Sequence, residues 1–88
     1  MIDVKEKGED VFEVTVSEDA SSTTHTVTLS DEYHRRLTGG EGSKTDLVRR
    51  SFEFLLQREG KESILRRFDL PVISRYFPEY ERIIGSAG

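Results

Sequence analysis

The chain has 88 residues, of which 34% are hydrophobic and 34% charged, and it contains no cysteine. This length suits one small domain, and the absence of cysteine excludes disulfides, thiolate metal sites and thiol nucleophiles. The formal net charge of -4, with seven acidic and two basic residues among residues 1–30, argues mildly against nucleic-acid binding but leaves a local basic surface possible in the rest of the chain.

The first predicted elements are two β-strands. Residues 11–17 alternate between apolar and polar side chains, which predicts a strand with one buried face formed by Phe12, Val14 and Val16. A shorter strand at residues 2–4 precedes it across a polar segment that contains a glycine. Together the two strands are expected to form a hairpin.

A third strand is predicted at residues 24–30, after a loop of small polar residues at 17–23. Its alternation is strict, and three β-branched threonines favour an extended backbone. The threonines, Thr24, Thr26 and Thr28, are expected to point outward. The opposite face, which is expected to point inward, consists of His25, Val27 and Leu29.

Two amphipathic helices are predicted next. Ser30 is a suitable N-cap for a short helix at residues 31–38, which two glycines end. Ser43, followed three residues later by an aspartate, approximates a capping box and marks the start of a helix at 44–59. The second helix has a continuous apolar stripe at helical spacing, formed by Leu47, Val48, Ser51, Phe52, Leu55 and Leu56.

A third helix is predicted at residues 61–68, with its apolar residues facing inward, and a further helical region at 71–84, within which Pro78 opens a last short helix. Residues 85–88 are expected to form a disordered tail after a single domain at 1–84. The predicted fold class is therefore α+β, with N-terminal antiparallel strands followed by three or four helices.

The order of elements from residue 24 to residue 57 resembles the ribbon-helix-helix unit of small DNA-binding regulators and antitoxins. The segment HTVTLS corresponds to the ribbon, and SKTDLVRRSFEFLL follows a Gly-rich turn as the second helix. The resemblance implies a homodimer that regulates transcription, in which two such strands pair and enter the major groove of duplex DNA. It assigns base contacts to Thr24, Thr26 and Thr28.

The same resemblance assigns phosphate contacts to the start of the second helix. The residues concerned are Ser43, Lys44 and Thr45, which lie at the positive end of the helix dipole. Arg49 is a further candidate for phosphate contact on the same helix. Other basic candidates on the two helices are Arg35, Arg36 and Arg50.

Two features leave a second interpretation open. The predicted ribbon strand has no Lys or Arg, and the strand at 11–17 can pair with it inside one chain. The chain would then be a different α+β domain, with a non-enzymatic protein-interaction or structural role. The aromatic residues Tyr76, Phe77 and Tyr80 are more apolar than a solvated extension needs, so they either pack onto the helices or bind a protein partner.

No enzyme site, metal or cofactor is predicted. His25 and His34 lack the further ligands that a metal ion requires, and we expect His25 to be a partly buried, hydrogen-bonded ring instead. Ser30 and His34 lack an orienting group for nucleophilic catalysis, and no nucleotide-binding motif is present. The N-terminus has no apolar core of a signal peptide and no stretch is long enough to cross a bilayer, so a cytoplasmic location without membrane contact is expected.

Overall fold

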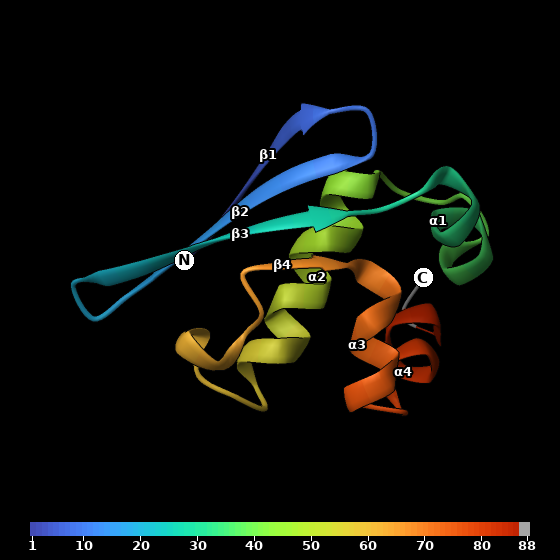
Figure 1. Ribbon diagram of the computed structural model, residues 1–88. Coiled ribbons are helices and arrows are strands. Elements are labelled where there is room, and N and C mark those ends of the chain that lie inside the picture. Colours follow the sequence, from blue (N-terminus) through green and yellow to red (C-terminus); the bar gives the residue numbers. More distant parts are fainter. Residues whose placement is uncertain (87–88) are drawn as a thin grey trace.

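The structure, a computed structural model, describes residues 1–86, and it is α+β: a four-stranded sheet packs against a set of helices, with three strands before the first helix and the fourth after the second (Figure 1). Three antiparallel strands follow one another, β1 (Ile2–Gly8), β2 (Val11–Glu18) and β3 (Ser21–Thr28). The short strand β4 (Arg67–Asp69) pairs with β3 in parallel and completes the order β1-β2-β3-β4.

The β2–β3 hairpin replaces the predicted loop at residues 17–23, and that prediction was wrong. A turn of two residues, Asp19 (φ 52°) and Ala20 (φ 66°), joins the strands, and residues on both sides of it pair across the ladder. Two successive positive φ angles give a turn whose twist matches that of the strands. As a result β3 begins three residues earlier than the predicted strand at 24–30, and it ends at Thr28 rather than at residue 30.

The first two helices begin at their predicted caps. Helix α1 (Asp31–Thr38) starts where the Ser30 hydroxyl accepts a hydrogen bond from the Tyr33 amide at 3.1 Å. Helix α2 (Lys44–Leu56) starts where the Ser43 hydroxyl accepts from the Asp46 amide at 3.0 Å. These bonds satisfy amides that have no partner within the first turn of a helix.

The chain after α2 differs from the prediction. The helix ends at Leu56 instead of residue 59, because the amides of Arg58 and Glu59 both donate to the Leu55 carbonyl and turn the chain. The predicted helix at 61–68 was wrong: a single 3₁₀ turn, η1 (Lys61–Ser63), leads into the extended strand β4. The edge of β3 supplies hydrogen bonds that outweigh the local helical pattern.

The predicted helical region at 71–84 is divided into three short elements. They are the 3₁₀ turn η2 (Leu70–Val72), α3 (Ile73–Tyr76) and α4 (Tyr80–Ser86). The break falls at Phe77, whose backbone (φ -131°, ψ 88°) is extended because it precedes a proline.

The predicted disordered tail at residues 85–88 lies partly within α4, which continues to Ser86. Residues 87–88 lie outside the described part of the chain. None of the helices in residues 1–86 is both long and apolar enough to cross a membrane.

The hydrophobic core lies between α2 and the inner face of the sheet. Helix α4 packs against α1, α2 and α3 (Figure 1). The Tyr80 side chain, which is fully buried, anchors it. The Ser51 hydroxyl donates to the Leu47 carbonyl, so the Tyr80 hydroxyl donates to Ser51 Oγ at 2.6 Å. Burial raises the pKa of Tyr80 to about 12, and this hydroxyl therefore remains a donor at neutral pH.

The strained hairpin turn gives a stability prediction. Ala20→Gly is expected to raise the free energy of unfolding by about 0.5 to 1 kcal/mol, because glycine adopts the left-handed conformation without strain. The higher entropy of glycine in the unfolded chain offsets part of this stabilisation. Urea denaturation measures the change. Ser22→Gly, at an exposed extended position of β3, is the control and should destabilise the protein; equal effects of the two changes would contradict the assigned turn.

Candidate functional site

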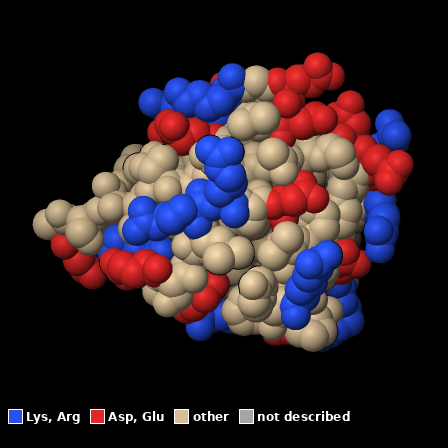
Figure 2. All heavy atoms as spheres, viewed as in Figure 1, with Lys and Arg blue, Asp and Glu red and all other residues tan. Residues whose placement is uncertain are grey.

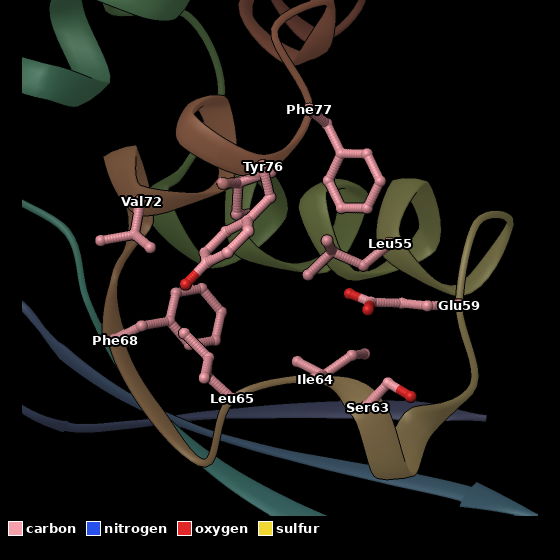
Figure 3. A pocket seen from close by; sticks show the side chains of 10 residues that line it. Leu55, Glu59, Ser63, Ile64, Leu65, Phe68, Val72, Tyr76 and Phe77 are labelled. Atoms are coloured by element: carbon pink, nitrogen blue, oxygen red, sulfur yellow. The ribbon is translucent and has the colours of Figure 1, made fainter.

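A groove of about 300 Å³ lies where the end of α2, the segment from η1 to β4, and α3 meet (Figure 3). We refer to it as the α2–α3 groove. Its lining is largely apolar and consists of Leu55, Glu59, Ser63, Ile64, Leu65, Phe68, Val72, Ile73, Tyr76 and Phe77. The whole lining lies within residues 55–77, so the groove forms where this stretch turns back after α2.

The backbone around β4 decides which side chains are buried and which are exposed in the groove. Ile64 and Phe68 point inward and are nearly buried, whereas Leu65 is 46% exposed. On the opposite wall Tyr76 is 66% exposed, although it is a large aromatic side chain. Exposed apolar side chains at the mouth of an apolar hollow are typical of a surface that binds another molecule.

His25 holds one wall of the groove in place from inside the protein. Its Nδ1 lies 2.8 Å from the Leu65 carbonyl oxygen and its Nε2 lies 2.8 Å from the Thr23 hydroxyl. Because a carbonyl only accepts, Nδ1 carries the proton and the Thr23 hydroxyl donates to Nε2. The ring is fully buried, and burial lowers its pKa below 6.5. The expectation that His25 is a hydrogen-bonded ring agrees with this arrangement.

Glu59 is the acidic residue of the groove. Its side chain is half-buried and points between Leu55 and Ile64 (Figure 3), and burial raises the pKa of its carboxyl. The two neighbouring cations are engaged elsewhere: Arg58 Nε lies 3.3 Å from Glu79 Oε2, and Lys61 Nζ lies 2.9 Å from Glu62 Oε2. Within residues 1–86, Glu59 therefore has no ion-pair partner.

The three aromatic residues predicted to bind a partner occupy different environments. Tyr76 and Phe77 line the α2–α3 groove. Tyr80 is fully buried, and its ring packs against Phe54 with a centroid distance of 5.2 Å. Only the first two side chains are therefore placed where a partner can reach them.

The threonines assigned to base contact lie on the outer face of β3. Thr24 and Thr28 are exposed and Thr26 is half-buried. The Thr28 hydroxyl donates to Asp69 Oδ1 at 2.7 Å. Inside one chain, β2 pairs with β3 along its whole length, and β4 occupies the other edge at Thr26–Thr28.

One of the residues assigned to phosphate contact is neutralised by carboxylates. Lys44 forms ion pairs with Asp10 and Asp31, and only 18% of its side chain is exposed. Ser43 is exposed and caps α2, while Thr45 and Arg49 are half-buried. On the face of the molecule in Figure 2, basic and acidic side chains are interspersed and do not form one basic surface.

No set of three or more potential metal-ligating side chains is assembled within residues 1–86. No protein-family model, curated protein or solved structure matches the chain. Its function is therefore inferred from the α2–α3 groove and the surfaces around it.

The sequence alone did not indicate the groove. Residues 61–68 had a helical pattern, and Glu59 was placed in the last turn of the preceding helix, where a carboxylate normally faces water. The available signal was Gly60, directly after Glu59, because a glycine commonly follows the end of a helix. It marks the point where the chain turns but does not reveal what the carboxylate will contact.

The buried histidine makes stability depend on pH. The pKa of His25 is lowered in the folded state, so the unfolded chain binds the proton more readily than the folded protein. The neutral buried ring therefore stabilises the fold above pH 6.5, and this stabilisation is lost as the pH falls below that value. In urea titrations, the free energy of unfolding should decrease between about pH 7.5 and about pH 5.5. His25→Gln should destabilise the protein by about 1 to 3 kcal/mol and flatten this decrease; an unchanged slope would contradict the assignment to His25.

Proposed function

We propose that this protein is a non-enzymatic protein-interaction domain, and that the α2–α3 groove binds a short peptide segment of a partner through one large apolar side chain. The observation that carries the proposal is the exposure of Leu65 and Tyr76 at the mouth of an apolar hollow. The other large hydrophobic residues with comparable exposure, Met1 and Ile83, do not line the groove. Apolar surface is thus concentrated at one concave site.

The dimensions of the groove favour a side chain as its occupant. A volume of about 300 Å³ lies at the lower end of the range for ligand sites, and it fits one aromatic or branched side chain better than a large cofactor. The groove contains one carboxyl group, of Glu59, and two hydroxyl groups, of Ser63 and Tyr76, and no base or oxyanion site converges on them. These features suit recognition and give no support to catalysis.

Binding of duplex DNA, and the ribbon-helix-helix likeness from which it came, stays a prediction. A ribbon shared by two molecules needs a free edge along the strand that carries Thr24 and Thr28, and in this chain β2 occupies one edge of β3 while β4 occupies the other at Thr26–Thr28. A DNA contact made by this part of the strand would therefore have to use the outer face of the sheet, where Arg67 is paired in register with Thr26.

A homodimer also stays a prediction. The long free edge of the sheet is β1, and its outer positions include Lys5 and Lys7. The register shifts between Glu6 and Gly8. Charged side chains and irregular pairing on an edge strand disfavour the addition of another strand. The peptide-binding proposal does not require a dimer.

The proposal is tested by selecting peptides from a displayed random library on the immobilised full chain, followed by fluorescence polarisation with the synthetic peptides. Selected peptides are expected to share a large apolar residue. Tyr76→Ser should weaken their binding by about tenfold, because it removes an exposed aromatic wall of the groove. Ser63→Trp should also weaken it, because the indole would fill space at an exposed position of the lining.

Ile83→Ser is the matched control, since Ile83 is an exposed apolar residue outside the groove lining. Its affinity for the peptides should equal that of the unmodified protein. Peptides that bind the Tyr76 and Ser63 variants as tightly as the unmodified protein would show that the groove is not the binding site.

Duplex DNA provides a separate test. If the chain is a peptide-binding domain, fluorescence anisotropy with labelled genomic duplexes should show only weak binding, because Lys44 is neutralised by two aspartates. A regulator of the ribbon-helix-helix type would bind at about 50 mM salt and lose about a thousandfold or more in affinity by about 200 mM. Such a steep dependence on salt would favour the DNA prediction over the proposed function.

A further inference from the structure

We propose that the α2–α3 groove is selective for a partner segment in which the apolar side chain lies next to a lysine or arginine, and that Glu59 binds this cation. The inference rests on the proposed function and adds the chemical class of the ligand. It follows from the arrangement of polar and apolar side chains along the groove, and from the lack of an ion-pair partner for Glu59 among residues 1–86.

The carboxylate lies at one end of the groove, and the rings of Phe68 and Tyr76 lie at the other. Figure 3 shows Glu59 and Ser63 together at the end formed by the loop after α2. Phe68, Val72 and Tyr76 lie together at the other end. A ligand that fills such a groove is itself amphipathic, with an apolar part against the aromatic rings and a hydrogen-bond donor or a cation against the carboxylate.

The cations that flank Glu59 in the chain have other contacts. Arg58 lies over the Phe54 ring at 3.6 Å, donates to the Phe54 carbonyl at 3.1 Å and pairs with Glu79. Lys61 is almost completely buried and pairs with Glu62. Neither the Lys61 ammonium nor the Arg58 guanidinium is therefore available to neutralise Glu59.

Glu59 loses hydration without a compensating charge. Burial removes water from the Glu59 carboxyl and raises its pKa, which means that its charged form is disfavoured at this position. A ligand cation would restore the charge stabilisation that water supplied, whereas a ligand carboxylate would be repelled. Because Glu59 is only half-buried, solvent screening weakens its attraction for the ligand cation. We therefore expect the cation to raise the affinity by roughly three- to tenfold.

The test uses three small probes that share a phenyl ring and differ in charge. They are 2-phenylethylamine, 2-phenylethanol and 3-phenylpropanoate, each titrated into the ¹⁵N-labelled full chain at about pH 8, where the carboxyl is ionised. The amine is expected to shift the amide resonances of Glu59, Leu65 and Tyr76 and to bind about three- to tenfold more tightly than the alcohol, with the carboxylate weakest.

Glu59→Gln keeps the shape of the side chain and removes its charge. In this variant the amine should bind no more tightly than the alcohol. Glu53→Gln is the matched control: this carboxylate is exposed on α2 and does not line the groove, so the preference for the amine should persist. Thermal unfolding of both variants verifies that they are folded.

The outcomes separate the inference from the proposal beneath it. Equal binding of the amine and the alcohol to the unmodified protein, or a preference for the amine that survives Glu59→Gln, would overturn the cation selectivity and leave the apolar groove as a binding site. If none of the probes shifts the groove resonances, and the selected peptides bind the groove variants as tightly as the unmodified protein, the proposed function fails together with the inference.

Discussion

The parallel pairing of β4 with β3 is the constraint on which the rest of the molecule depends. The Thr26 amide donates to the Arg66 carbonyl at 2.8 Å, and the Thr28 hydroxyl donates to Asp69 at the other end of the short strand. A third link joins the His25 ring to the Leu65 carbonyl. These bonds hold the segment that returns from α2 against the sheet, and the α2–α3 groove forms because that segment is fixed there.

The same pairing connects fold and function. A strand in a sheet has two hydrogen-bonding edges, and β3 uses one for β2 and the other for β4. The edge that a shared ribbon would need is thus the edge that builds the wall of the groove. At Thr26–Thr28, pairing with a second molecule would displace β4 and with it a wall of the groove, which is a physical reason to favour peptide recognition over the ribbon mode of DNA binding.

Local patterns were sufficient for much of the fold. Alternation located the inner faces of β2 and β3, including the inward position of His25, and the serine caps located the starts of α1 and α2. They failed at residues 61–68, where Ile64 and Phe68, four apart, suit a helix as well as two inward positions of an irregular segment. A strand of three residues is stabilised by a distant partner, so its own sequence has little power to specify it. The groove was missed for the same reason.

The position of Glu59 has consequences for stability as well as recognition. A carboxylate that is partly removed from water without a partner lowers the stability of the folded chain. The neighbouring cations nevertheless make other contacts: Arg58 pairs with Glu79 before α4, and Lys61, the first residue of η1, is buried and pairs with Glu62. Unfavourable local arrangements of this kind are tolerated in small proteins where they contribute to binding, because a ligand can supply the interaction that the fold leaves out. The uncompensated carboxylate beside exposed apolar side chains is thus better explained by a ligand than by the requirements of folding.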